Sequence, residues 1–166
     1  MKFKDLSAPN TSDGKNKVWL SEKSYQEVSG VFVGEPNEYR IHWVNGKVVC
    51  SGPQCEHCEM AELSNNKKLK SQFRFVLSFI HKGPHGGLQS SIYEGDIFAY
   101  RKLVELNNQS PLEKTVVRIY KHQEGNYFND MFEQVKVLDN AEAKNVNDFY
   151  EASISTPSGN DSDIPF

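Results

Sequence analysis

The segment Arg40-Ile-His42-Trp43-Val-Asn45-Gly46-Lys-Val-Val49-Cys50 carries the strongest local structural signal in this chain. Two apolar runs flank Asn45-Gly46, and an Asn-Gly pair supplies the two positive φ angles of a type I′ turn. The segment therefore predicts a β-hairpin with a two-residue turn. In that register His42 lies opposite Val49, so Cys50 joins His42 on one face only if the strand ends or bulges there.

The hairpin leads directly into a cluster of cysteines at positions 50, 55 and 58. Cys55-Glu-His-Cys58, with Gly and Pro just before it, has the spacing of a knuckle that presents two thiolates to one Zn²⁺. An odd number of cysteines at this spacing favours metal binding in a reducing compartment over a disulfide framework. The alternative is three buried cysteines without metal, and the polar neighbours Gln54 and Glu56 argue against it.

Structural zinc takes four ligands, so a histidine has to complete the set. The candidates are His42, His57, His81 and His85. We favour His42, because the short tether inside the knuckle would strain simultaneous ligation by His57. The sequence thus predicts one structural Zn²⁺ held by His42, Cys50, Cys55 and Cys58.

Apolar residues alternate with more polar ones in further segments of the chain. The Phe residues at 73, 75 and 79 predict a half-buried strand over 73–80 with its Phe side toward the core. A turn is expected at Gly34-Glu35-Pro36-Asn37, and a hairpin loop at Gln123-Glu124-Gly125-Asn126. The expected strands are 17–20, 25–33, 39–44, 47–50, 73–80, 115–122 and 127–138.

Helical spacing of apolar residues predicts two helices, over 96–107 and 140–152. Residues 1–16 have no such period, so we expect a flexible arm there, and residues 153–166 offer nothing to pack. The expected fold is mostly β with one or two helices. It is an OB-like small barrel over 17–152, with the zinc knuckle at 50–58 and a disordered acidic tail over 153–166.

Length and composition limit the class of protein. The 166 residues with 37% hydrophobic content suit one domain with a real core. The longest apolar run, Phe75 to Ile80, falls far short of the ~20 residues that span a bilayer, and the N-terminus lacks a secretory signal. We therefore expect a soluble cytoplasmic protein.

The charge is distributed unevenly along the chain. Residues 1–138 carry 18 Lys and Arg against 16 Asp and Glu, whereas residues 139–166 carry 1 against 6. A weakly basic body permits phosphate binding on one face, and the acidic tail is free for another role. The net charge of -3 therefore neither requires nor excludes a nucleic-acid partner.

An enzymatic reading of the cysteine cluster fits poorly. Zinc nucleobase deaminases carry Pro-Cys-x-x-Cys after a His-x-Glu. Here Pro53 is displaced by one residue from that pattern, and His42 is followed by Trp-Val. The expected strands also carry few carboxylates for a metal-dependent nuclease. We therefore expect a binding protein and no enzyme.

Basic and aromatic residues on the expected strands suggest a single-stranded-DNA interface. Such interfaces use cations for phosphates and rings for base stacking. Arginines are expected opposite the apolar face of three strands, and three lysines fall in a loop. Aromatic residues at alternate strand positions are more often core than platform, which is the alternative for Trp43. The candidates are Arg40, Trp43, Lys67, Lys68, Lys70, Arg74, Arg118 and Tyr120, with Trp19, Tyr39 and Tyr93 as further stacking residues.

The chain ends in Asp161-Ser-Asp163-Ile164-Pro165-Phe166. This ending resembles the C-terminal tip of bacterial single-stranded-DNA-binding proteins, in which an acidic stretch ends in Asp-Ile-Pro-Phe. The resemblance implies that Phe166 fills an apolar pocket on a partner enzyme while Asp161 and Asp163 face a basic rim. Ser162 stands where that family usually has another acid. The implied partners are replication and repair enzymes of the helicase, exonuclease or primase class.

The body, over roughly residues 24–138, resembles zinc-containing phage single-stranded-DNA-binding proteins of the OB class. The residues that carry this likeness are Arg-Ile-His42-Trp, Cys50, Cys55-x2-Cys58 and the Phe-Arg-Phe strand, followed by a helix and a final hairpin. The resemblance implies a phage-encoded protein that protects single-stranded DNA in replication, recombination or repair within the host cytoplasm. The alternatives are a decoy or adaptor that occupies host enzymes, and a zinc-ribbon binder of RNA or duplex DNA.

Overall fold

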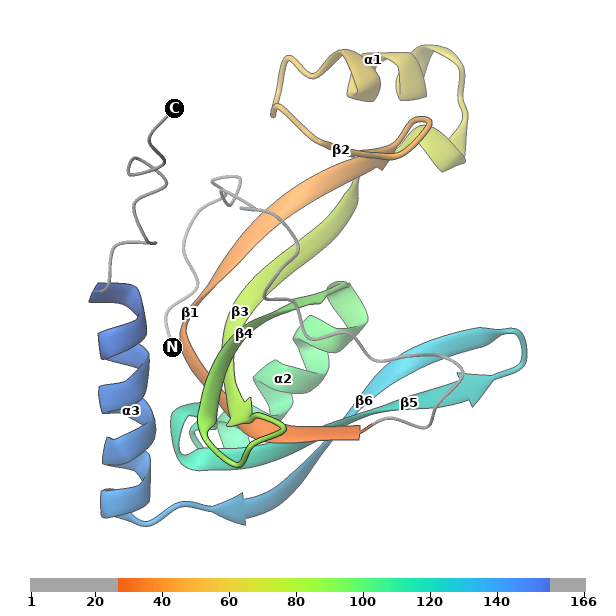
Figure 1. Cartoon of the computed structure of the whole chain (residues 1–166). Helices are drawn as coiled ribbons and strands as arrows, with labels where there is room; N and C mark the ends of the chain where they lie inside the picture. The colour runs from red at the N-terminus through yellow and green to blue at the C-terminus, as the bar shows by residue number, and fades with distance from the viewer. Residues whose placement is uncertain (1–26, 156–166) are drawn as a thin grey trace.

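The computed structural model describes residues 27–155, which form six strands and three α-helices (Figure 1). The expected arm over 1–16, the strand over 17–20 and the terminal tip lie outside these residues. The elements are β1 (Glu27–Trp43), β2 (Lys47–Val49), α1 (Glu56–Leu63), β3 (Gln72–Lys82), β4 (Leu88–Gly95), α2 (Ile97–Gln109), β5 (Thr115–Glu124), β6 (Tyr127–Val137) and α3 (Asn140–Ser155), with short 3₁₀ turns at Lys67–Leu69 and Leu112–Lys114.

The strands form one antiparallel sheet in the order β4-β3-β1-β5-β6, with β2 paired to the end of β1. The mostly β class is thus confirmed, but the sheet is not closed by hydrogen bonds, since among residues 27–155 no pairing joins β4 to β6. These two edge strands meet instead through side chains. The rings of Tyr93 and Phe132 lie 5.6 Å apart, and the Tyr93 hydroxyl donates to Asp130 at 2.5 Å.

The main core lies between one face of the sheet and helix α2. Phe75, Leu77 and Phe79 of β3 are at most 3% exposed, so the predicted apolar face of this strand is confirmed. Leu103 of α2 and Ile119 of β5 complete the same cluster. Each large apolar side chain buried in this way stabilises the fold by about 1.5–3 kcal/mol.

Helix α3 covers part of the opposite face of the sheet. Its Val146, Phe149 and Tyr150 pack against Val31, Val33 and Ile80, as the helical spacing predicts. The Tyr150 hydroxyl occupies the position that a Cβ at Gly34 would take, and Gly34 has a φ of +75°, so only glycine fits there. The helix continues to Ser155, beyond its expected end at residue 152.

Three further features differ from the sequence prediction. The turn expected at 34–37 is a bulge within one continuous strand, because β1 keeps its pairing with β3 on both sides of a register shift between Val33 and Asn37. Strand β4 was not predicted, since Gln89, Ser90 and Ser91 break the apolar alternation. Helix α1 was not predicted either, because it has little apolar periodicity and buries only Ala61.

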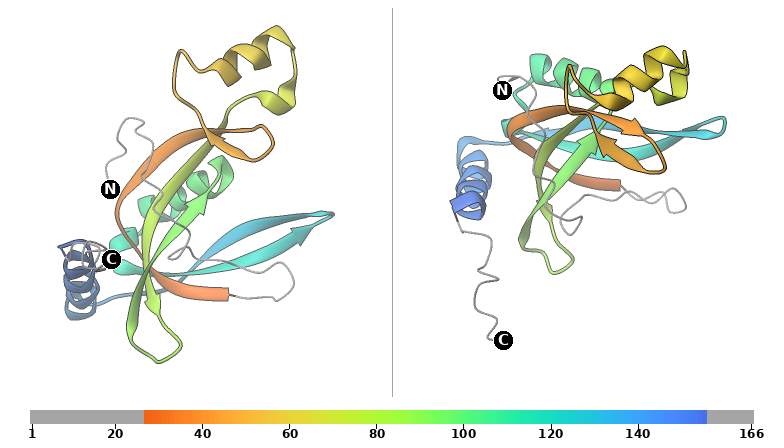
Figure 2. Two further views of the ribbon diagram at one scale, coloured as in Figure 1. Left: turned by 45° about the horizontal axis from the view of Figure 1, so that its top comes forward. Right: turned by 90° about the horizontal axis from the view of Figure 1, so that it is seen from above.

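Two projections extend from the body, and both point away from α3 (Figure 2). One is the metal lobe, by which we mean residues 44–71. The other is the β5–β6 hairpin. The hairpin is confirmed, but its loop is shorter than predicted, since Glu124 pairs with Tyr127 around Gly125-Asn126. None of the helices among the described residues has the length and apolar character of a membrane span.

Candidate metal centre and nucleic-acid interface

The register of the β1–β2 hairpin brings His42 and Cys50 to one face. Trp43 pairs with Lys47 and His42 with Val48, so the loop has three residues and the predicted two-residue turn is wrong. The Cys50 amide donates to the Arg40 carbonyl at 2.8 Å, which continues the same register. A shift of one residue reverses which face every side chain takes. Because of this shift, no bulge is needed to place Cys50 beside His42.

The four predicted ligand residues converge, since their ligand atoms all lie within 4.8 Å of one another. His42 Nε2 is 3.5 Å from Cys55 Sγ and 3.4 Å from Cys58 Sγ, and Cys50 Sγ is 3.6 Å from Cys58 Sγ. A tetrahedral zinc site, with Zn–S of about 2.3 Å and Zn–N of about 2.0 Å, separates its ligand atoms by about 3.5–3.8 Å. His42, Cys50, Cys55 and Cys58 therefore lie close enough to hold a metal ion, with a geometry consistent with zinc.

His42 is oriented by its second ring nitrogen. Its Nδ1 is 2.8 Å from the Leu69 carbonyl oxygen, and the ring is fully buried. Donation from Nδ1–H to that carbonyl fixes the tautomer and leaves the Nε2 lone pair facing the thiols. His57 lies beside the site, with its ring centroid 5.5 Å from that of His42, but is not among the converging ligands. His81 is bonded to Ser91 instead.

The thiols differ in the electrostatic surroundings of their sulfur atoms. Burial raises the pKa of Cys55, but hydrogen bonds from the backbone of Ser51, Cys58 and His57 outweigh it and lower the pKa to about 5. Burial and the neighbouring thiols Cys50 and Cys55 raise the pKa of Cys58 to about 11. Three thiolates in one cluster repel one another, and a bound dication removes this conflict.

The predicted lysine loop is a 3₁₀ turn anchored at its C-terminal end. Its Leu69 carbonyl is held by His42, as described, and Arg40 donates to the Ser71 hydroxyl at 2.8 Å and to the Ser71 carbonyl at 3.0 Å. Lys67 and Lys68 are exposed on this turn, and so is Lys70 just after it. The metal site is therefore linked mechanically to a row of lysines.

The three predicted arginines do not share one face of the sheet. Arg40 pairs with Phe73 and Arg74 with Tyr39, so Arg40 and Arg74 lie on opposite faces. Arg118 pairs with Ser29, near the other end of β1, and its guanidinium bridges Glu27 and Glu133. Arg40, Arg74 and Arg118 therefore do not form one continuous basic face.

The predicted aromatic platform is also divided. Tyr39 and Tyr93 are 2% exposed, so they belong to the packed interior and cannot stack on bases. Trp43 is 48% exposed, which excludes the core alternative for this residue. Tyr120 lies under the Arg118 guanidinium, 4.9 Å from its ring centroid. Trp19 lies outside the described residues.

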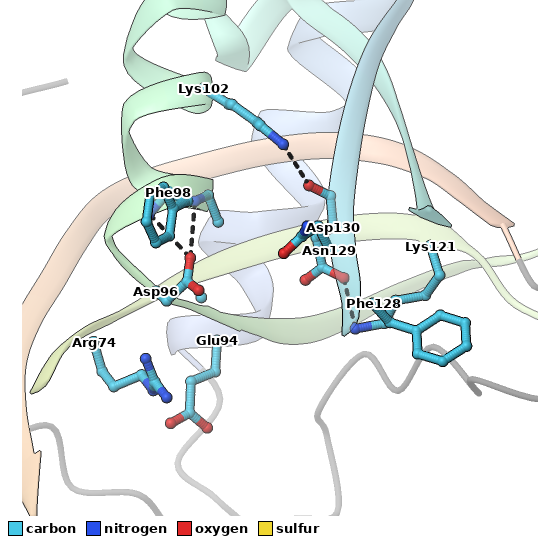
Figure 3. Close-up of a pocket in the computed structure, with 11 residues that line it drawn as sticks. Arg74, Glu94, Asp96, Phe98, Lys102, Lys121, Phe128, Asn129 and Asp130 are labelled. Carbon is cyan, nitrogen blue, oxygen red and sulfur yellow. Dashed lines mark hydrogen bonds and ion pairs between the residues drawn. The ribbon is translucent and has the colours of Figure 1, made fainter. Parts of the chain in front are cut away.

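A hollow of about 230 Å³ opens between α2, the ends of β3 and β4, and β6 (Figure 3). Phe98 at its rim is 64% exposed, and Phe128 of β6 is half-buried there. Its cations are Arg74, Lys102 and Lys121, and its carboxylates are Glu94, Asp96 and Asp130.

The carboxylates of the hollow are engaged by donors of the protein itself. Asp96 caps α2 by accepting from the amides of Phe98 and Ala99, both at 3.0 Å. Asp130 accepts from Tyr93 and forms an ion pair with Lys121 at 2.7 Å. The hollow therefore brings aromatic rings and cations next to carboxylates that are already engaged by the protein itself.

Of the residues that line the hollow, sequence reasoning identified only Arg74. Phe98 occupies an exposed position at the start of α2. Its one visible signal was a bulky ring two residues after the N-cap Asp96, outside the buried stripe of Ala99 and Leu103. Phe128 follows the hairpin turn, where the strand pattern gives no orientation. No protein-family model, curated protein or solved structure matches this chain.

Proposed function

We propose that this protein is a non-enzymatic single-stranded-DNA-binding protein and that the strand runs through the hollow. The observation that carries the proposal is a hollow lined by the exposed ring of Phe98, the ring of Phe128 and the cations Arg74 and Lys102. A third cation there, Lys121, is ion-paired with Asp130. Proteins that hold single strands combine rings for base stacking with cations for the backbone.

The topology supports the same proposal. Five long strands in the order β4-β3-β1-β5-β6, with α2 between β4 and β5, form a strongly curved open sheet. OB-folds are five-stranded, partly open barrels that bind oligonucleotides on one face and between two loops. We propose an OB-like barrel left open between β4 and β6. The metal lobe and the β5–β6 hairpin would then be the two loops beside the binding face.

We further propose that the metal is zinc with a structural role. Three cysteines and one histidine fill a tetrahedral site completely, which leaves no open position for a substrate or an activated water. Zinc would hold the β1–β2 hairpin, α1 and the lysine turn as one lobe. When bound, the ion contributes folding energy and no reaction chemistry.

The test is a titration of the purified protein with labelled oligothymidine, duplex DNA and RNA of one length. We expect the tightest binding to single-stranded DNA, with affinity falling as salt rises because counterions are released. Phe98→Ala should weaken it by about 1–3 kcal/mol, the value of one stacked base. Ile154→Ala, which removes an exposed apolar side chain from α3, is the matched control. Equal affinity of the parent for duplex or RNA would overturn the proposal.

We also propose that the C-terminal Asp161–Phe166 recruits replication and repair enzymes. Support comes from the sequence resemblance alone, because the tip lies outside the described residues. Deletion of Ile164, Pro165 and Phe166 removes the apolar anchor but keeps both aspartates. Binding to a helicase or exonuclease that reads such tips should be lost, while affinity for DNA changes little. Undiminished partner binding by the truncated protein would refute this role.

A further inference from the structure

Four strands bring polar side chains together at the edge of the hollow. Tyr39 comes from β1, Lys47 from β2, Arg74 from β3 and Glu94 from β4. Arg74 and Glu94 line the hollow itself and lie next to each other in Figure 3. This group is also where the metal lobe joins the sheet, because Lys47 begins the second strand of the lobe's hairpin.

The Glu94 carboxylate is the common acceptor of this group. Both the Lys47 ammonium and the Tyr39 hydroxyl donate to its Oε1 atom. Lys47 Nζ also lies 3.1 Å from the Tyr39 hydroxyl. Burial, followed by the hydrogen bond to Glu94, raises the pKa of Tyr39 well above its usual value, so its hydroxyl keeps its proton and remains a donor.

The donors around Glu94 have the chemistry of an oxyanion site. An ammonium, a hydroxyl and a neighbouring guanidinium can each donate to a phosphate oxygen, and charge-assisted bonds of this kind are among the strongest in proteins. Within residues 27–155, the hydrogen bonds of Arg74 go to neutral acceptors, the Phe73 carbonyl at 3.1 Å and the Gln72 amide oxygen at 3.4 Å. Arg74 is therefore not neutralised by those two bonds.

We propose that Lys47, Arg74 and the Tyr39 hydroxyl form a binding subsite for a backbone phosphate, and that Glu94 fills this subsite in the free protein. The inference rests on the proposed binding of single-stranded DNA and adds an internal competitor to it. An entering phosphodiester replaces the carboxylate as the acceptor, and the Glu94 side chain, 17% exposed, turns out toward solvent. Glu94 thereby lowers the affinity for any polyanion.

A purely structural role for Glu94 makes the opposite prediction. If the carboxylate only pins the lobe's hairpin to β4, its neutralisation loosens the lobe and weakens DNA binding. If it competes with phosphate, neutralisation frees the Lys47 ammonium and strengthens binding. The sign of the change in affinity separates the two roles.

The test compares Glu94→Gln with Glu133→Gln in the full-length, metal-loaded protein. Both variants remove one carboxylate, but Glu133 is on β6, paired with Arg118 and away from the hollow lining. We expect Glu94→Gln to bind oligothymidine about threefold to tenfold more tightly than the parent at low salt. Glu133→Gln should change the affinity little, because salt screens the effect of a charge that lies far from the bound strand. The gain should shrink as salt rises.

Thermal melting of both variants establishes that they are folded. A folded Glu94→Gln that binds no better than Glu133→Gln overturns the inference but leaves the proposed function intact. If Glu94→Gln does not fold, Lys47→Gln provides the test. Loss of one phosphate contact should reduce the slope of log affinity against log salt concentration by about 0.7 in magnitude. An unchanged slope in Lys47→Gln overturns the subsite. A parent that binds no single-stranded DNA overturns the function and the inference together.

Discussion

The metal lobe and the sheet body are stabilised by different means. Within residues 44–71, the buried apolar residues are Cys55 and Ala61 alone, and the lobe is held by the convergence of four ligands. The body contains a cluster of aromatic and aliphatic residues, among them Phe32, Phe75 and Phe79, which are at most 1% exposed. We therefore propose that the lobe, which lacks an apolar core, depends on a bound metal for its fold, whereas the body does not.

The largest expected effect is the removal of metal. Structural zinc contributes about 10–16 kcal/mol to the folding of small zinc domains, far more than the lobe gains by burying apolar surface. A strong chelator should therefore unfold the lobe and leave the body folded. Amide hydrogen exchange measured region by region checks this, with protection lost between residues 44 and 71 and retained in β3 and β5.

Metal analysis supplies the control for this prediction. Protein prepared without chelators should contain one equivalent of zinc, and Cys58→Ser or His42→Ala should lower that content sharply. Less than half an equivalent of zinc in the parent would contradict the claim that metal stabilises the lobe. Full zinc retention in His42→Ala would mean that another residue is the fourth ligand.

A smaller effect is expected from the core of the body. Phe79→Ala leaves a cavity in the aromatic cluster and should lower the free energy of unfolding by about 3–5 kcal/mol. Met60→Ala, in the lobe, removes a side chain that is 52% exposed and should change it by less than about 0.5 kcal/mol. Urea denaturation followed by tyrosine and tryptophan fluorescence measures both. Equal losses in the two variants would contradict the difference between the regions.

The smallest effect concerns the charges of the two regions. Lys67→Ala with Lys68→Ala should reduce the magnitude of the salt slope for oligothymidine by about 1.4, if each lysine meets one phosphate. Arg118→Ala should leave the slope unchanged, because Glu27 and Glu133 already neutralise its guanidinium. Salt titrations of both variants check this. A reduced slope in the Arg118 variant alone would indicate that DNA binds instead on the face of β5 that carries Arg118 and Tyr120, here called its outer face.

Local patterns in the sequence predicted the ligand set and most of the elements. The Asn45-Gly46 pair identified the hairpin, and the Cys-x2-Cys spacing identified the knuckle. The register was missed because Val44 joins the loop, where its amide donates to the Gly46 carbonyl at 2.9 Å. Two-residue and three-residue loops with Asn-Gly differ only in such contacts, which the sequence does not reveal.

The interface was harder to predict because it depends on which face each strand buries. Tyr39 and Ile41 are buried on one face of the sheet and Phe75 on the other, so no single polar face exists along its whole length. The sequence of one strand cannot show this. It reveals the alternation of apolar and polar residues, but not which face of the sheet a helix or another strand covers. Phe98 was overlooked for a similar reason, because its exposure depends on where α2 packs.

The most direct test of the proposed site is photocrosslinking of the full-length protein to oligothymidine that contains 5-bromouracil, followed by mapping of the crosslinked residues. Aromatic rings that stack on bases are the residues expected to react. The account predicts crosslinks at Phe98 and Phe128, in the hollow. Crosslinks confined to Tyr120, on the outer face of β5, would contradict it and place the DNA on the other side of the sheet.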